Sequence, residues 1–249
     1  MSRVFEVGFS QRVRMEWFQE AALLVLAGST RKEVKESLLN SLRGKVSIGG
    51  LAERGNREKI ISILSRTWLP DSGPLNPFRM DGLELLTNCP MDQLVAIHWG
   101  MVSATYPFWA NVGEQVGRLL ALQGTVSALQ VQRRMRELLG ERETVSRATR
   151  RVLRSYHDWG VLIETNTKGT YGKAQPIRID APKTISWLIE ATLMSRAIPK
   201  APFRDLAQSH SMFPFNVPFI SVEEFLKHSP RIERLRHGLD MDLVYPIQP

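Results

Sequence analysis

Hydrophobic residues recur every three to four positions along most of the chain, which is the spacing of amphipathic helices. In the first part of the chain, this spacing predicts helices over residues 11–26, 29–42, 57–68, 80–88 and 91–104. Ser29 or Thr30 is a suitable N-cap for the second of them. The stretches 47–56 and 70–77 contain glycine or proline and are expected to be loops. Residues 1–108 are therefore expected to form an all-helical domain.

A different pattern follows Tyr106-Pro107, and a second domain is expected over residues 109–181. The predicted helices of this domain lie at 111–123, at 127–139 and within 144–162. Two β-prone stretches come next, VLIET at 161–165 and QPIRI at 175–179, and the glycines between them favour a hairpin with a long loop. Helix, helix, turn, helix and hairpin is the order of a winged helix-turn-helix, so we expect that fold here.

The third helix of this domain, within TVSRATRRVLRSYHDWGVL at 144–162, has one apolar face and one arginine-rich face. At about 100° per residue, the positions within about 60° of Val145 are Ala148, Thr149, Val152, Tyr156 and Trp159. The positions roughly 140° to 240° away are Arg147, Arg150, Arg151 and Arg154. We expect the apolar face to pack on the preceding helices and the arginine face to point outward. In helix-turn-helix proteins the outward face of this helix enters the major groove.

Positive charge is concentrated in the second domain. The chain has 33 Lys and Arg against 25 Asp and Glu, a net charge of +8. Residues 127–183 hold twelve of the cations and six of the acids, and no acid lies between Arg147 and Arg154. Arginine is always charged, and its planar fork fits phosphate oxygens and a guanine edge. The arginine face therefore predicts double-stranded DNA as the partner, with a plain solvated face as the alternative.

Candidate DNA-binding residues come from two helices and the hairpin of this domain. The hairpin loop offers basic and aromatic side chains beside glycines, which suits a wing that contacts the DNA backbone or the minor groove. The predicted DNA-binding residues are Arg133, Arg134, Arg147, Arg150, Arg151, Arg154, Lys168, Tyr171 and Lys173. For the three hairpin residues, a plain solvent-exposed hairpin is the alternative.

The last part, residues 182–249, is expected to be a helix followed by an extension rich in proline and phenylalanine. The helix is predicted over 182–197. The stretch 198–219 contains four prolines and four phenylalanines. These aromatic side chains favour an irregular segment packed on the body, and a strap that engages a partner is the alternative. Ser221 and Glu224 match a capping box, so a short helix is expected to begin there.

The sequence contains no recognisable catalytic motif. It has no HExxH, P-loop or CxxC pattern, and its five histidines are scattered, so we expect neither an enzyme nor a cofactor. The segment HGLDMD, with His237, Asp240 and Asp242, leaves a metal-dependent nuclease as one alternative. Its alternating aspartates are more typical of a turn or strand, and a closing strand is predicted over 242–247. The glycines of 49–55 follow no predicted strand, which favours a loop over a phosphate-binding site.

The chain has features of a cytoplasmic protein. Cys89 is its single cysteine, so no intrachain disulfide is possible, which suits a reducing compartment. The longest apolar run, 21–27, is far shorter than the roughly 20 residues that a membrane span needs. Charged and apolar residues alternate at the N-terminus, unlike in a signal peptide. We therefore expect no membrane partner.

Three stretches carry a resemblance to a known family. They are FQEAALLVL at 18–26, REKI at 57–60 and TVSALQVQRRMRELLGERETVSRATRRVLRSYHDWGVL at 125–162. In this order they resemble the BrxA proteins of BREX phage-defence systems, over roughly residues 5–180. The resemblance implies a small helical protein with a DNA-binding winged-helix part and no known catalytic centre. It carries a DNA-binding role over to the matching basic helix, Arg147–Arg154.

The function predicted from the sequence is non-catalytic binding of double-stranded DNA by an accessory component of a bacterial phage-defence system. Its expected partners are duplex DNA and other proteins of that system. Two non-catalytic alternatives are a protein–protein adaptor that uses the winged helix as scaffold and a sequence-specific transcriptional regulator.

Overall fold

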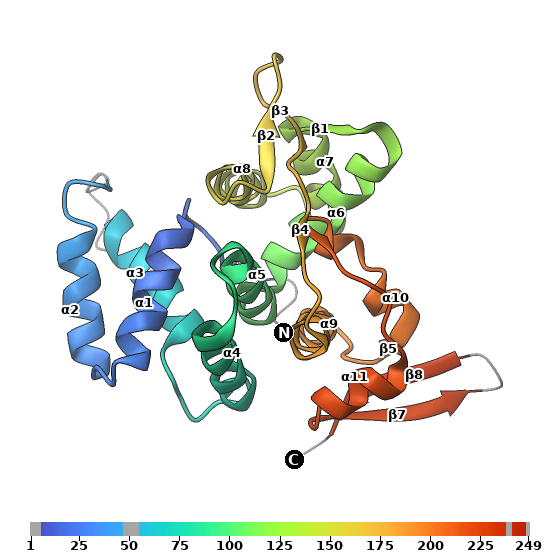
Figure 1. Cartoon of the computed structure of the whole chain (residues 1–249). Coiled ribbons are helices and arrows are strands. Elements are labelled where there is room, and N and C mark those ends of the chain that lie inside the picture. The colour runs from blue at the N-terminus through green and yellow to red at the C-terminus, as the bar shows by residue number, and fades with distance from the viewer. Residues whose placement is uncertain (1–5, 47–54, 238–240, 248–249) are drawn as a thin grey trace.

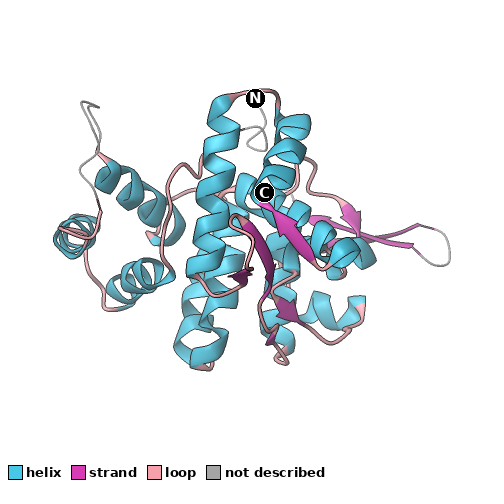
Figure 2. Ribbon diagram, turned by 90° about the horizontal axis from the view of Figure 1, so that it is seen from above, coloured by secondary structure: helices cyan, strands magenta, loops and turns pink. Residues whose placement is uncertain are grey.

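Helices make up most of the described chain, and its strands form three small sheets (Figures 1 and 2). The computed structural model describes residues 6–46, 55–237 and 241–247. The predicted fold class, mainly α, is confirmed at this level.

The N-terminal part consists of helices at the positions that the hydrophobic spacing predicts. They are α1 (Met15–Leu26), α2 (Arg31–Ser41), α3 (Asn56–Trp68), α4 (Asn76–Asn88), the 3-10 helix η2 (Met91–Gln93) and α5 (Leu94–Thr105). Helix α1 begins later than predicted, because Arg14 is still extended. Thr30 caps α2: its hydroxyl accepts the Glu33 N–H, and the Glu33 carboxylate accepts the Thr30 N–H. The predicted glycine loop lies largely outside the described residues.

The middle of the chain forms a unit of helices and short strands. Its elements are α6 (Pro107–Gln123), β1 (Thr125–Ser127), α7 (Ala128–Leu139), α8 (Glu143–Asp158), β2 (Leu162–Glu164) and β3 (Thr170–Lys173). The strands are antiparallel in the order β1-β3-β2, with Val126 opposite Tyr171 and Leu162 opposite Lys173. The central strand β3 pairs with both β2 and β1, so the hairpin that follows α8 is joined to the strand that leads into α7.

The hairpin differs from the one that the sequence predicts. Its second strand is β3, inside the stretch assigned to the loop, and the prediction that 175–179 pairs with the first strand is wrong. Gly169, with φ of 75°, lets the chain turn back early. Pro176 lacks the N–H that a strand ladder requires. Ile177–Arg178 instead forms β4, which pairs in parallel with β6 (Phe215–Asn216).

The C-terminal part packs short elements around one longer helix. They are α9 (Pro182–Met194), β5 (Ala201–Pro202), α10 (Phe203–Ala207), the 3-10 helix η3 (His210–Met212), α11 (Val222–His228), β7 (Ile232–His237) and β8 (Met241–Pro246). The helix capped by Ser221 and the closing strand are confirmed, whereas β7 was not predicted. The stretch 198–219 is packed on the body through Phe203, Phe213 and Phe215.

These parts surround the central helix α5. In Figure 1, α1, α2 and α3 lie on one side, the β2–β3 hairpin projects at the top, and β7 and β8 lie at the opposite lower corner. Every residue of α5 is buried. It packs against α1, α3 and α4 on the N-terminal side, and against α6 and α9 from the rest of the chain.

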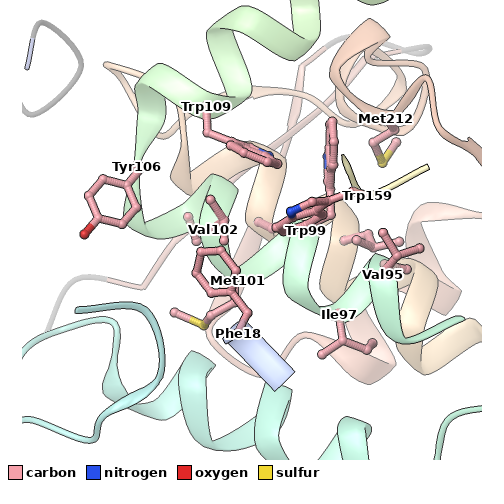
Figure 3. Close-up of a cluster of buried hydrophobic side chains, with 14 of the residues drawn as sticks. Phe18, Val95, Ile97, Trp99, Met101, Val102, Tyr106, Trp109, Trp159 and Met212 are labelled. Carbon is pink, nitrogen blue, oxygen red and sulfur yellow. The ribbon is translucent and has the colours of Figure 1, made fainter. Parts of the chain in front are cut away.

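A cluster of aromatic side chains joins the three predicted domains (Figure 3). The ring of Trp99 in α5 lies 5.2 Å from Trp109 in α6, and Trp109 lies 4.8 Å from Trp159 after α8. Phe213 of the C-terminal part lies 5.6 Å from Trp99, and Phe9 lies 4.9 Å from Trp109. One hydrophobic core therefore continues through all three ranges.

Candidate nucleic-acid interface

The two faces of α8 are arranged as its sequence predicts. Its apolar side is buried, and the buried residues on that side include Val145, Ala148, Thr149, Val152 and Tyr156. The Tyr156 hydroxyl donates a hydrogen bond of 2.7 Å to the carbonyl oxygen of Trp109, which fixes α8 on α6. Arg147, Arg150 and Arg154 are exposed. Three guanidinium groups therefore project from one helix whose other side is held in the core.

Arg151 differs from its three neighbours. It is half-buried, and its guanidinium donates a hydrogen bond to the carbonyl oxygen of Ser10. Burial lowers the pKa of Arg151, and the nearby cations Arg147 and Arg150 lower it further. Arg151 is thus a positive charge in an unfavourable setting, partly engaged within the protein.

One acid accompanies the arginines at the start of the helix. Glu143 lies 3.4 Å from the Arg150 guanidinium and 3.8 Å from that of Arg147. All three side chains are more than half exposed, so these pairs contribute little to stability and can be exchanged for another anion. Within the described residues, Arg154 has no ion-pair partner.

A segment far away in the sequence runs beside α8. The Val13 N–H donates to the Ser155 hydroxyl at 2.9 Å, and the Trp159 indole donates to the Val13 carbonyl at 3.0 Å. Arg12 forms a two-fold ion pair with Asp158 at the end of α8, with both hydrogen bonds at 2.5 Å. The segment before α1 therefore fixes the position of α8 from one side, which the sequence pattern did not reveal.

This segment leaves an open groove at the start of α8. The groove has a volume of about 850 Å³ and lies between the N-terminal segment, α3 and the first half of α8. Its charged lining residues are Glu6, Lys59, Arg142, Arg147 and Arg151. Lys59 and Arg142 were not among the predicted site residues. Helix periodicity cannot show that α3, which carries Lys59, lies opposite α8, and Arg142 precedes the first residue of α8 and so lies outside its periodic faces.

The hairpin places one predicted residue at its tip. Lys168 is exposed on the turn between β2 and β3. The turn is closed by Glu164, whose carboxylate accepts the Gly169 N–H at 3.1 Å. Lys168 has no ion-pair partner among the described residues, so its charge is available to a ligand.

Tyr171 and Lys173 do not lie at the tip, and that part of the prediction is wrong. Both belong to β3, because the turn is shorter than predicted. Tyr171 is buried opposite Val126, and burial raises the pKa of its hydroxyl. Lys173 is exposed at the far end of the strand, where it lines a hollow of about 500 Å³ beside η3. Neither side chain extends the surface formed by Lys168.

Arg133 and Arg134 also lie apart from the arginines of α8. They line a hollow of about 720 Å³ between α6 and α7, to which no described residue of α8 contributes. Arg133 is paired with Glu137 at 2.9 Å, one helical turn away. The structure therefore brings together Arg147, Arg150, Arg151 and Arg154 but does not add Arg133 and Arg134 of α7 to them.

The described residues contain no cluster that suits a metal ion. No three His, Cys, Asp or Glu side chains come together in the described ranges. Asp242 lies 3.8 Å from Arg234, and Asp240 lies outside those ranges. Within the same residues, no helix combines the length and apolar character needed to cross a bilayer.

Comparisons with other proteins provide no assignment. No protein-family model, curated protein or solved structure matches this chain.

Proposed function

We propose that this chain binds double-stranded DNA through a winged helix-turn-helix formed by residues 107–173. In this proposal α8 is the recognition helix and the β2–β3 hairpin is the wing. The order α6, β1, α7, α8, β2, β3, with β3 between the other two strands, supports it. The observation that carries the proposal is the exposed face of α8 with Arg147, Arg150 and Arg154.

The arginine face suits both kinds of contact that proteins make with DNA. Guanidinium groups neutralise phosphates, and one inserted in the major groove can donate two hydrogen bonds to a guanine edge. Arg147 and Arg150 can exchange their ion pairs with Glu143 for contacts with phosphate oxygens. This exchange costs little free energy, because exposed ion pairs are weak. Lys168 at the hairpin tip adds a contact with the backbone beside the helix.

The test is fluorescence anisotropy of a labelled random-sequence duplex across a salt series. We expect wild-type affinity in the micromolar range or tighter at low salt, with a steep salt slope. Replacing both Arg150 and Arg154 by Ala is expected to weaken binding about tenfold or more. The salt slope should flatten by about 0.9 for each phosphate that the variant no longer neutralises.

Arg196→Ala/Arg204→Ala is the matched control, since both are exposed arginines outside residues 107–173. It removes two positive charges from another part of the molecule and is expected to leave affinity nearly unchanged. Equal affinity of the folded α8 double variant and the wild type would contradict the assignment of the recognition helix.

As a second part of the proposal, the resemblance to BrxA proteins supports a role of this DNA binding in phage defence. Deleting the chain from a bacterial locus that encodes it is expected to reduce protection against phage. Restoring the Arg150→Ala/Arg154→Ala variant should not recover that protection. Full protection in the absence of the chain would contradict the defence role. It would not contradict DNA binding, and a sequence-specific regulator would then be the alternative role.

An adaptor role is favoured by one surface observation. Ile198 and Phe219 are 73% and 79% exposed, and Phe219 borders a groove of about 800 Å³ between α10 and β8. Exposed aromatic side chains are typical of protein contacts. Weak duplex binding that does not change with salt would favour this role over DNA binding.

A further inference from the structure

We propose that the groove between the N-terminal segment, α3 and α8 binds the phosphodiester backbone of the same duplex. This proposal rests on the DNA-binding function proposed above. It extends the DNA contact from α8 onto the N-terminal helices, with Lys59 as the contributing residue of α3. The ligand chemistry is a phosphate anion, and its source is the backbone of the bound DNA.

The charge of the groove favours an anion. Lys59, Arg142, Arg147 and Arg151 line it, and Glu6 is the single acid among its lining residues. Lys59 has no ion-pair partner within the described residues. Arg142 donates a hydrogen bond to the Leu139 carbonyl at 3.1 Å, which orients its guanidinium without neutralising it. Four cations therefore converge from two helices and a loop on one hollow.

Arg151 shows that this concentration of charge is unfavourable in the protein alone. Its guanidinium is partly withdrawn from water beside Arg147 and Arg150, and both of these cations lower its pKa. The Ser10 carbonyl provides a partial dipole rather than a full negative charge. A phosphate in the groove would supply the missing anion for Arg151 and relieve the repulsion.

The groove is continuous with the face of α8 that is proposed to contact DNA. Arg147 belongs to both, because it is exposed on α8 and also lines the groove. A DNA strand that crosses the arginine face can therefore pass directly into the groove. The groove volume of about 850 Å³ also exceeds the space of a single phosphate group, as a continuing backbone requires.

Lys59 can be tested without altering α8. In the anisotropy assay, Lys59→Ala is expected to weaken duplex binding about fivefold and to flatten the salt slope by about 0.9, the value for one phosphate contact. Lys59→Gln keeps a long helix-forming side chain and is expected to behave like Lys59→Ala. Lys59→Arg preserves the charge and should retain wild-type binding. Thermal unfolding confirms that each variant is folded.

Lys32→Ala is the matched control on the neighbouring helix. The Lys32 side chain is 85% exposed on α2 and does not line the groove. Its removal lowers the net charge by the same amount and should change affinity by less than twofold. If Lys59→Ala and Lys32→Ala have equal effects, the groove makes no specific contact and the proposal is wrong.

The two proposals fail in different ways. No duplex binding by the wild type at low salt would overturn the DNA-binding function itself. Steep, Arg150- and Arg154-dependent binding that is insensitive to Lys59→Ala would overturn the groove proposal alone.

Calorimetry with inorganic pyrophosphate tests whether the groove binds a free phosphate compound instead of the DNA backbone. Saturable, Lys59-dependent uptake of pyrophosphate, with duplex binding unaffected by Lys59→Ala, would also overturn the DNA-backbone assignment.

Discussion

His98 is a titratable side chain that is fully buried in the core. The Trp68 indole N–H donates to its Nδ1 at 3.1 Å, so the proton of the neutral ring lies on Nε2 and is donated to the Gln19 amide oxygen at 2.7 Å. Burial lowers the pKa of His98 to about 3. The ring therefore links α1, α3 and α5 as a neutral hydrogen-bonding group.

This histidine predicts loss of stability in mild acid. Between about pH 6.5 and about pH 3 the unfolded chain binds a proton at His98 and the folded chain does not, so stability decreases as the pH falls through this window. From pH 7 to pH 5 the loss from this residue is about 2 kcal/mol. Urea unfolding at both pH values should show that loss in the wild type beyond that of His98→Gln, which cannot titrate. Equal pH dependence of the two proteins would contradict the prediction.

At the residue scale, the sequence predicts which side of a helix a side chain faces. It does not predict which distant residues that side chain contacts. Helical periodicity correctly assigned Arg147, Arg150 and Arg154 to the exposed side of α8. It could not show that Arg151 meets the carbonyl of Ser10, because that contact joins residues 141 positions apart. The same limitation explains why Lys59 was missed.

At the element scale, α6 and η3 approach each other closely at Gly117. A Cβ atom added to Gly117 would lie 2.0 Å from the carbonyl oxygen of His210, which is part of the backbone and cannot rotate away. Glu114 fixes the same contact, since its carboxylate accepts the Ser211 N–H at 3.0 Å and the Ser209 hydroxyl at 3.1 Å. The C-terminal part therefore packs directly against α6 at η3, and the hydrogen bonds of Glu114 hold this contact.

Gly117→Ala tests this packing because two effects have opposite signs. Helix propensity alone would stabilise the protein by about 1 kcal/mol. The clash with His210 is expected to exceed that gain and to lower the free energy of unfolding by about 1–3 kcal/mol, as measured by urea denaturation. Gly113→Ala is the comparator, since its nearest atom, the Tyr156 hydroxyl oxygen, lies 3.2 Å away. A Gly117→Ala protein at least as stable as the wild type would show that η3 is not held there.

Elements with strong periodicity were predictable, and elements that depend on distant partners were not. Helices α2, α3 and α9 follow their hydrophobic spacing closely, and α2 is also capped by Thr30 as predicted. Strand β1 has only three residues, and its pairing partner β3 lies more than 40 residues later, so no local pattern marks it. The hairpin was misplaced because β-propensity favoured 175–179, whereas Gly169 and Pro176 determined where the chain turns and pairs.

At the scale of the whole molecule, the core is shared by all parts of the described chain. Helix α5 is buried along its full length between the N-terminal helices and α9. The aromatic cluster of Trp99, Trp109 and Trp159 receives Phe213 from the C-terminal part. If one part unfolded separately, the hydrophobic side chains that the other parts bury against it would be exposed to water.

We therefore expect one cooperative unfolding transition for the 249-residue chain. Calorimetric and van't Hoff enthalpies should agree, and tryptophan fluorescence should change together with far-ultraviolet circular dichroism. Lys173→Ala, at an exposed position on β3, is a suitable variant that should leave the transition unchanged. Two resolved transitions would indicate that the predicted domains unfold independently.

The position of the N-terminal segment beside α8 has a consequence for the order of synthesis. Val13 is made before its hydrogen-bond partner Trp159, which follows 146 positions later in the chain. At the usual rate of translation this interval is about 7–30 seconds. Until then the hydrogen bonds of Val13 with Ser155 and Trp159 cannot form, although Phe9 of the same segment can already pack against Trp109. The segment before α1 is thus made well before α8 but is fixed beside it only after α8 has been made.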